Sequence, residues 1–139
     1  MKILAVDYGD ARTGLAVCDE MEMLASPLGT VHGAWQPKVA EQIAEKAKEC
    51  GVKEIVMGYP LNMDGSAGDR AMKCKEFAQI LEALTGLPVR MWDERGTTVS
   101  AHRMLNITNT RGKKRKSVVD QVAAVVILQS YLEYRKHIS

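Results

Sequence analysis

The architecture follows from residues 2–19, KILAVDYGDARTGLAVCD, in which two apolar segments flank a polar, glycine-bearing turn. Residues 3–6 are all apolar, so both faces of this first predicted strand suit burial, as in a central strand of a sheet covered on both sides. The apolar run ends at Asp7. An aspartate there either caps the following turn or acts as a metal ligand in a cleft at the sheet edge, and taken alone it is more typical of a turn.

Two more predicted strands follow the first directly. After a hairpin loop over residues 8–13, residues 14–18 form a second apolar strand and residues 24–31 a third. Pro27 cannot donate a hydrogen bond to a neighbouring strand, which predicts that the third strand lies at an edge of the sheet. The chain therefore opens as an antiparallel β-β-β meander.

After the third strand, helices and strands alternate. Apolar residues recur at helical spacing over residues 37–50. Residues 54–58 then contain a compact apolar run, typical of a buried strand that lies parallel to the first and is reached through a crossover helix. Residues 89–92 predict a fifth strand, which runs directly into Asp93 and Glu94.

The second predicted helix follows a turn-rich loop over residues 59–68. Ser66 and Asp69 match a helix-capping pattern at its start. The helix is expected to pack on the sheet through an apolar stripe made of Cys74, Phe77, Ala78, Leu81 and Leu84.

Two helices are predicted after the fifth strand, a short one over residues 97–106 and a long one from Ser117 to about Lys136. A polar, basic loop over residues 107–116 joins them. The order β-β-β-α-β-α-β-α-α predicts an α/β fold, with a mixed five-stranded sheet and helices packed on its faces. The length of 139 residues is typical of one domain.

The amino-acid composition predicts the cellular compartment and limits the classes of partner. The three cysteines are odd in number and widely spaced, which predicts reduced thiols and a reducing, cytoplasmic compartment. The N-terminal segment has neither a signal-peptide nor a membrane-span pattern, so no membrane partner is expected. Aromatic residues make up 5% of the chain and do not interleave with basic ones, so Trp35 and Trp92 are expected to pack rather than to stack on bases.

The formal net charge is only +2, but positive charge is concentrated in one segment. Five positive side chains fall within six residues, namely Arg111, Lys113, Lys114, Arg115 and Lys116. Such a run is either a solvated loop or a tether for the phosphate backbone of a nucleic acid. Its position just before the last helix favours the tether.

Acidic residues mark three points: Asp7, the pair Asp93 and Glu94, and Asp120 near the start of the last helix. The first and fifth strands are both candidates for the parallel part of the sheet, and the carboxyl ends of such strands border a common crevice. Small residues three and four positions after Asp120 would let its helix approach the sheet and carry this acid inward.

Converging carboxylates in a dry site need a cation to offset their repulsion. Oxygen ligands suit Mg²⁺ or Mn²⁺, and two such ions roughly 3.5–4 Å apart can activate a water and stabilise the leaving oxygen in phosphodiester cleavage. The three histidines share no metal-ligand spacing, so zinc is not expected.

A resemblance to a known family rests on four ordered motifs: DYGDARTG at residues 7–14, VMGYPLNMDGSAG at 56–68, WDERGTTVSA at 92–101 and DQVAAVVILQSYL at 120–132. Together they resemble the YqgF/RuvX family of ribonuclease H-like proteins, which is related to Holliday junction resolvases and is linked to pre-16S ribosomal RNA processing. The resemblance spans essentially the whole chain. It implies a single ribonuclease H-like nuclease domain over residues 1–139.

The resemblance also implies that Asp7, Glu94 and Asp120 are the metal-binding and catalytic acids. Side-chain alternation cannot choose between Asp93 and Glu94, because it fails at strand ends. The family's DER motif favours Glu94, and Asp93 is the alternative. Many family members carry a larger residue after this motif, where this chain has Gly96.

Four further residues are candidates for contact with nucleic acid. Arg12 and Arg95 offer paired donors to phosphate, unless they form surface ion pairs. Asn62 and Ser66 lie in a loop that contains Gly65, whose backbone can approach a nucleic acid strand closely, unless the loop merely joins a strand to a helix.

These features together predict a metal-dependent nuclease that acts on structured nucleic acid, with the pre-16S ribosomal RNA as the favoured substrate. The same acids would serve a resolvase acting on branched DNA. A non-catalytic nucleic-acid-binding module of the same fold is the third hypothesis. The chain is expected to be a monomer or a weak homodimer.

Overall fold

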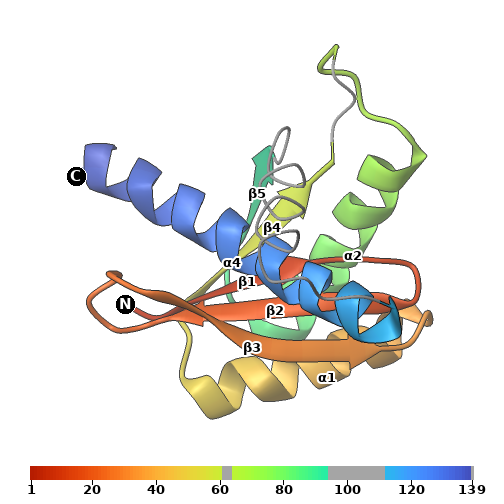
Figure 1. The fold of residues 1–139 in the computed structure, drawn as a ribbon, viewed down its shortest axis with the longest axis horizontal. Helices are drawn as coiled ribbons and strands as arrows, with labels where there is room; N and C mark the ends of the chain where they lie inside the picture. Colours follow the sequence, from red (N-terminus) through yellow and green to blue (C-terminus); the bar gives the residue numbers. More distant parts are fainter. Residues whose placement is uncertain (61–63, 94–111, 139) are drawn as a thin grey trace.

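The structure, a computed structural model, describes residues 1–60, 64–93 and 112–138, with the side chains of 112–120 and 138 left out of the description. In chain order (Figure 1), its elements are β1 (Ile3–Asp7), β2 (Arg12–Cys18), β3 (Ala25–His32), α1 (Gln36–Cys50), β4 (Glu54–Tyr59), α2 (Asp69–Thr85), β5 (Val89–Asp93) and α4 (Gly112–Ile138). The predicted short helix over residues 97–106 lies outside the described residues.

The strands form one mixed sheet in the order β3-β2-β1-β4-β5. β1 is antiparallel to β2 and parallel to β4, and β4 is parallel to β5. β1 is the central strand, as its two apolar faces predict, and β3 lies at an edge, as Pro27 predicts. The predicted α/β architecture with a mixed five-stranded sheet is confirmed.

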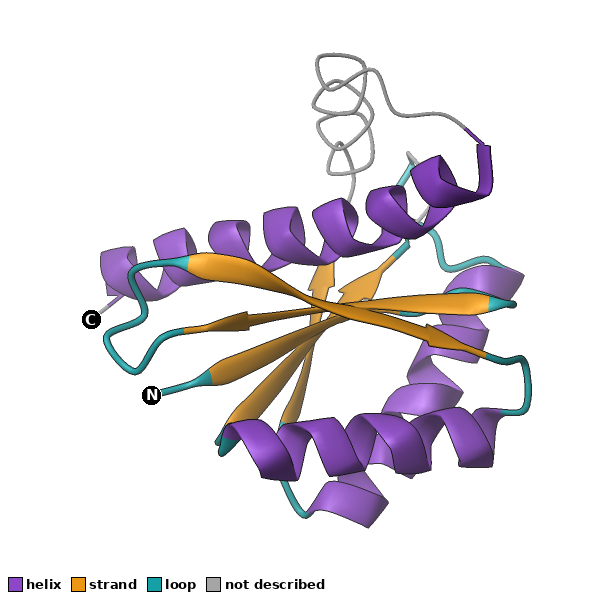
Figure 2. Cartoon of the chain, turned by 60° about the horizontal axis from the view of Figure 1, so that its bottom comes forward, coloured by secondary structure: helices purple, strands orange, loops and turns teal. Residues whose placement is uncertain are grey.

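Helices cover both faces of the sheet (Figure 2). Leu4 and Val6 of β1 pack in a core with α1 and α2, whereas Ile3 and Ala5 pack in a second core under α4. All four side chains are fully buried. Burial of each of the larger aliphatic chains contributes roughly 1.5–3 kcal/mol, so β1 holds the two layers together.

Glycines end both α1 and α2. Gly51, with φ 71°, donates its N–H to the carbonyl of Ala47, and Gly86, with φ 70°, donates to that of Glu82. Glycine adopts this left-handed conformation without a steric cost. Each turn returns the chain to a strand parallel to β1.

The predicted apolar stripe of α2 is confirmed over most of its length, but the predicted burial of Leu84 is wrong. Cys74, Phe77, Ala78 and Leu81 are buried, whereas Leu84 is 49% exposed. Leu84 lines a surface groove whose opposite wall, from α1, includes the small residues Ala44 and Ala47. Those side chains are too short to cover it.

The predicted capping role of Ser66 and Asp69 is also wrong. The residue at the cap position is Gly68, and no side chain makes a capping hydrogen bond. Ser66 instead donates its N–H (2.9 Å) and its hydroxyl (2.6 Å) to the Asp64 carboxylate. This local turn competes for the same polar groups as a helix cap.

The last helix begins earlier than predicted. α4 starts at Gly112 rather than Ser117, so residues 113–116 belong to its first turns and not to a loop. Lysine and arginine are good helix formers, and this propensity outweighs the unfavourable placement of positive charge at a helix N-terminus. The basic run is therefore continuous with the helix that carries Asp120.

The two tryptophans differ. Trp92 packs against the core under α4, as predicted, whereas the packing predicted for Trp35 is wrong, because this residue is 70% exposed. Trp35 occupies the cap position before α1 with an extended backbone, which leaves it at the surface.

The cysteines Cys18, Cys50 and Cys74 are free thiols, as predicted. Burial raises the pKa of the Cys18 thiol, which keeps it protonated. Within the described ranges, no helix has the length and apolar character needed to cross a membrane.

Candidate active site

Asp7 lies at the carboxyl end of the central strand, between two glycines. In β2 its register partner is Gly14. On the other side Val6 pairs with Met57, so the next position in β4, beside Asp7, is Gly58. Both glycines are buried, and Asp7 is partly exposed. No side chain from an adjacent strand therefore crowds this carboxylate.

Asp7 belongs to the face of the sheet that α4 covers. Side chains alternate along a strand, and Ile3 and Ala5, which share the parity of Asp7, pack in the core under α4. At the same level of this face, Thr30 pairs with Gly14 in β2 and Trp92 pairs with Gly58 in β4. A row across all five strands thus carries Asp7 at its centre.

The turn after Asp7 is held in place by close packing. A Cβ atom on Gly9 would lie 2.3 Å from the carbonyl oxygen of Arg12, so only glycine fits there. The ring of Tyr8 stacks on Phe77 of α2 at a centroid distance of 4.3 Å, and Arg70 donates to the Tyr8 carbonyl at 3.2 Å. These contacts fix the backbone immediately after the carboxylate, which favours a preorganised ligand.

Helix α4 is anchored to the same row, next to Asp120. Gln121 donates its side-chain N–H to the hydroxyl of Thr30 at 3.1 Å. Ala123 and Ala124 are buried, so the helix approaches the sheet closely, as the sequence predicts. Asp120 directly precedes Gln121 in α4, and its side chain lies outside the description.

Asp93 lies on the other face of the sheet. Val89 and Met91 share its parity and pack against the core with α1 and α2, whereas Trp92 packs under α4. Asp93 itself is exposed at the end of β5. Asp93 pairs with Tyr59 of β4, which packs against the core with α1 and α2, so Asp93 does not share a face with Asp7, while Glu94 lies outside the described residues.

Among residues whose side chains the structure describes, no group of three or more histidines, cysteines or acids is placed to hold a metal ion. Of the three predicted acids only Asp7 has a described side chain. The donor chemistry at its position, a carboxylate flanked by two glycines, fits a hard divalent cation.

The predicted nucleic-acid contacts are described in part. Arg12 is the first residue of β2, partly buried and close to Asp7 along the hairpin, and Ser66 is held by Asp64. Asn62, Arg95 and Arg111 lie outside the described residues. Lys113, Lys114, Arg115 and Lys116 lie on α4, and their side chains are outside the description.

Gly58, Gln121 and Arg70 contribute to this site although the sequence alone predicts no role for them. Gly58 lies within one of the four motifs, but only the strand register shows that this glycine stands beside Asp7. Gln121 follows an expected ligand directly, which is a usable signal, whereas the contact of Arg70 with the Tyr8 carbonyl spans two distant segments.

Two solved structures share this fold. A structure titled "T. thermophilus RuvC in complex with Holliday junction substrate" matches with a TM-score of 0.62 at 13% identity, covering 98% of this chain and 96% of that one. The Fowlpox virus resolvase, crystallised with Holliday junction DNA, matches with a TM-score of 0.62 at 12% identity, covering 97% and 99%. The fold is therefore the ribonuclease H-like fold of RuvC-like resolvases.

The family profile described as "RuvX: Holliday junction resolvase" matches residues 1–134, and this chain belongs to the RuvX family. A relative from Protochlamydia amoebophila (strain UWE25), named "Putative pre-16S rRNA nuclease", is 45% identical, covering 96% of this chain and 94% of its own length. One of the same name from Desulfitobacterium hafniense (strain DSM 10664 / DCB-2) is 43% identical, covering 96% and 93%. The family is thus one of nucleases.

Proposed function

We propose that this chain is a metal-dependent phosphodiester hydrolase that processes the pre-16S ribosomal RNA. The observation that carries the proposal is Asp7, set between Gly14 and Gly58 at the carboxyl end of the central strand, on the face that α4 covers. Because both adjacent strand positions are glycines, no side chain of β2 or β4 at this level fills the space beside this partly exposed carboxylate, which suits a cation and a phosphate.

Asp7, Glu94 and Asp120 would hold Mg²⁺ or Mn²⁺ in this proposal, with Asp93 disfavoured by its parity on the opposite face. When bound, the ions activate a water and stabilise the leaving oxygen of a phosphodiester. The packing of Tyr8 on Phe77 keeps Asp7 oriented, and the hydrogen bond from Gln121 to Thr30 keeps α4 in register with it.

Polar and positively charged side chains would position the backbone of the substrate. We assign this role to Arg12 and Arg95 near the acids, to the loop with Asn62 and Ser66, and to the basic run from Arg111 to Lys116 at the start of α4. Such contacts supply affinity and salt dependence but little sequence preference.

Resolution of branched DNA is the second candidate activity. It is favoured by the family's description as Holliday junction resolvase and by the shared fold with resolvases. A non-catalytic nucleic-acid-binding module is the third, and the glycine-flanked acid argues against it, because binding alone does not need a clear space beside Asp7.

A cleavage panel tests the assignment. Purified protein is incubated with pre-16S RNA, duplex RNA and four-way DNA junctions, each with Mg²⁺ or Mn²⁺. We expect cleavage of the RNA precursor and a loss of more than about a hundredfold in Asp7→Asn, since even supporting groups around a metal contribute 10–100-fold. Asp10→Asn is the matched control, because Asp10 lies in the same turn, 72% exposed and 3.8 Å from Lys73.

Each outcome has a defined meaning. Cleavage of the junction alone favours the resolvase. RNA binding without cleavage, together with no heat of metal binding, supports the non-catalytic module. Equal cleavage by Asp7→Asn and the wild type rules out the proposed site.

We further propose that the chain is a single domain, a monomer or weak homodimer, and cytoplasmic. The compartment follows from its three free thiols, which suit a reducing environment.

A further inference from the structure

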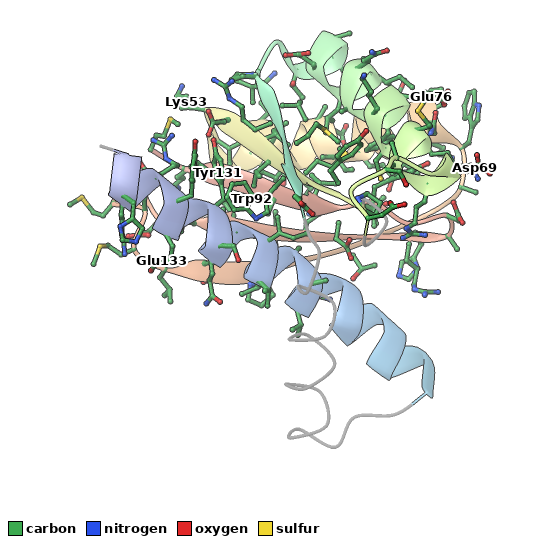
Figure 3. All side chains as sticks on the ribbon, turned by 90° about the horizontal axis from the view of Figure 1, so that it is seen from above. Lys53, Asp69, Glu76, Trp92, Tyr131 and Glu133 are labelled. Carbon is green, nitrogen blue, oxygen red and sulfur yellow. The ribbon has the colours of Figure 1, made fainter. Side chains whose placement is uncertain are left out.

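A groove of about 360 Å³ lies between β5 and the C-terminal half of α4. Figure 3 shows two of its residues, Trp92 and Tyr131, between the helix and the sheet. The groove is lined by Glu54, Arg90, Met91, Trp92, Tyr131, Tyr134 and Arg135. Its lining combines aromatic rings with charged groups, whereas the described lining of the groove between α1 and α2 contains no aromatic ring.

Three aromatic rings form one side of this groove. Trp92 meets Tyr131 edge-on at 5.5 Å and Tyr134 at 5.3 Å between ring centroids. Tyr131 is buried, whereas Tyr134 is 48% exposed. A cluster built only for the core would bury all its rings, so the exposed ring beside Trp92 leaves a flat apolar surface in contact with solvent.

Charged groups border these rings. The Arg90 side chain is 63% exposed and has its Nε 3.6 Å from Glu54 Oε1. Glu54 is buried and accepts a hydrogen bond from the Tyr131 hydroxyl on Oε2 at 2.7 Å. The 3.6 Å separation is longer than a hydrogen bond, which leaves Oε1 able to accept an N–H from a ligand.

The groove begins next to the row that contains Asp7. Trp92 pairs with Gly58, the residue beside Asp7, so Trp92 lies two strands from Asp7 on the same face. Strands are spaced by about 4.8 Å, so the backbones of Asp7 and Trp92 lie about 10 Å apart. From Trp92 the groove extends along β5 toward Glu54, at the start of β4.

We propose that this groove binds an unpaired nucleobase of single-stranded RNA next to the scissile phosphate. Every base has a π-face that stacks on aromatic rings or on a guanidinium plane. Every base also carries an N–H on its pairing edge, for which Glu54 Oε1 is an acceptor. The proposal rests on the proposed function for its position relative to cleavage, but base binding itself does not require metal or cleavage.

The test measures RNA binding in EDTA, so that cleavage plays no part. Trp35→Phe leaves Trp92 as the only tryptophan, and its fluorescence reports occupancy directly. Short single-stranded RNA is compared with an oligonucleotide of equal length and charge that contains abasic sites. Tyr134→Ala is the test variant, because its exposed ring can be removed at little cost to the fold, and Trp35→Ala is the exposed aromatic control.

We expect intact RNA to quench the fluorescence of Trp92. The affinity for intact RNA should be about tenfold lower in Tyr134→Ala than in the wild type, with an unchanged salt dependence. The affinity for the abasic oligonucleotide should not fall in this variant. Trp35→Ala should bind as the wild type does. An equal loss of affinity for both oligonucleotides overturns the proposal. An absence of fluorescence quenching by intact RNA also overturns it, and points to a protein ligand or to a purely structural cluster. Absence of cleavage in the separate panel would leave this result standing, so the two failures are distinguishable.

Discussion

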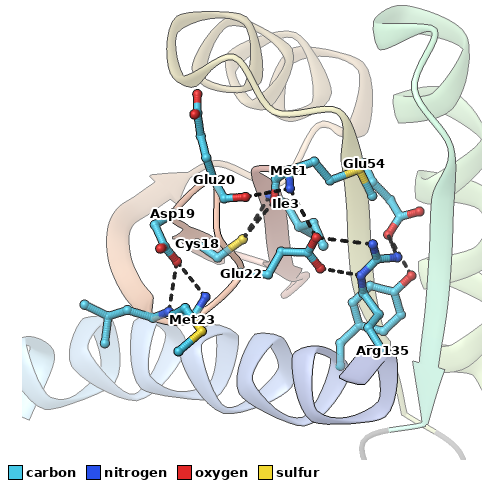
Figure 4. Close-up of polar contacts among 11 residues, drawn as sticks. Met1, Ile3, Cys18, Asp19, Glu20, Glu22, Met23, Glu54 and Arg135 are labelled. Carbon is cyan, nitrogen blue, oxygen red and sulfur yellow. Dashed lines mark hydrogen bonds and ion pairs between the residues drawn. The ribbon is translucent and has the colours of Figure 1, made fainter. Parts of the chain in front are cut away.

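The face of the sheet under α4 has two ends, at the carboxyl end and at the amino end of β1, and their polar groups are arranged differently. At the carboxyl end of β1, glycines flank the carboxylate of Asp7. At the amino end, charged groups are bonded to one another (Figure 4): Arg135 donates to Glu22, and Glu22 also pairs with the N-terminal ammonium at 3.1 Å. In the first arrangement the neighbouring strands place no side chain beside the acid, and in the second the bonds of Glu22 join α4 to the start of the chain.

The amino end also contains a buried acid with its own partners. Glu54 is contacted by Tyr131, by Arg90 and by Arg135, whose Nη1 lies 3.8 Å from it. Burial, together with the hydrogen bond to Glu54, raises the pKa of the Tyr131 hydroxyl, so this group remains a donor. We infer that the bonds of Tyr131 and Arg135, in the C-terminal half of α4, stabilise the fold, whereas the contact of Gln121 in its N-terminal half positions the helix beside the row of Asp7.

The largest expected effect is on RNA cleavage and comes from adding a side chain beside Asp7. In Gly58→Ala a methyl group occupies the space next to the carboxylate, and a displacement of about 1 Å at a reacting centre costs about a hundredfold in rate. We expect a loss of that order in RNA cleavage, with a small change in the free energy of unfolding. The measurements are single-turnover cleavage and urea unfolding of the same preparations.

The matched control is Gly29→Ala, in the edge strand β3, where an added Cβ would have no atom within 4 Å. Gly29 has φ 151°, so this control carries some backbone strain and should lower stability more than activity. If Gly58→Ala cleaves RNA as fast as the wild type, the space beside Asp7 has no role in catalysis.

A change at the amino end should lower the free energy of unfolding and leave RNA cleavage intact. Tyr131→Phe removes the donor to the buried Glu54 carboxylate, and an unsatisfied buried group costs about 1–3 kcal/mol. We expect a loss of unfolding free energy in that range with cleavage retained at a temperature where the variant is folded. Tyr134→Phe, at an exposed ring, is the control and should stay within about 0.5 kcal/mol. A cleavage defect in folded Tyr131→Phe would contradict the inferred roles of the two ends.

Much of the fold was predictable because its signals are local. The apolar residues before Asp7 indicate a central strand, Pro27 indicates an edge, and glycines end both α1 and α2. The predicted start of α4 at Ser117 is wrong because a polar, basic run suggests a loop, whereas lysine and arginine also favour helices.

The site was predictable only in part, for a different reason. Asp7 could be identified from its place at the end of a strand, but the role of Gly58 depends on strand register. The partners of Glu54 were also beyond prediction, because β4, β5 and α4 contribute them from distant parts of the chain. Packing that joins distant segments leaves no local pattern in a single sequence.

The smallest expected effect concerns Glu22, whose contribution to the unfolding free energy should depend on pH. This residue adopts a left-handed backbone, φ 56°, which costs about 1–2 kcal/mol in a non-glycine residue, and its ion pairs offset that cost. The hydrogen bond from Arg135, reinforced by the N-terminal ammonium and opposed by burial, lowers the pKa of Glu22 below its ordinary value of 4.5.

The sign of the pH dependence follows from that shift. Because the pKa is lower in the folded state, the stabilisation is present above pH 4.5 and is lost as the pH falls through the folded-state value. Glu22→Gln should therefore lower the unfolding free energy by about 1 kcal/mol at neutral pH and by much less at a pH low enough to protonate the folded-state carboxylate. Urea unfolding at the two pH values measures both differences. A difference that stays the same at both would mean that the charge of Glu22 does not hold α4, and that the amino end is stabilised by packing around Tyr131 instead.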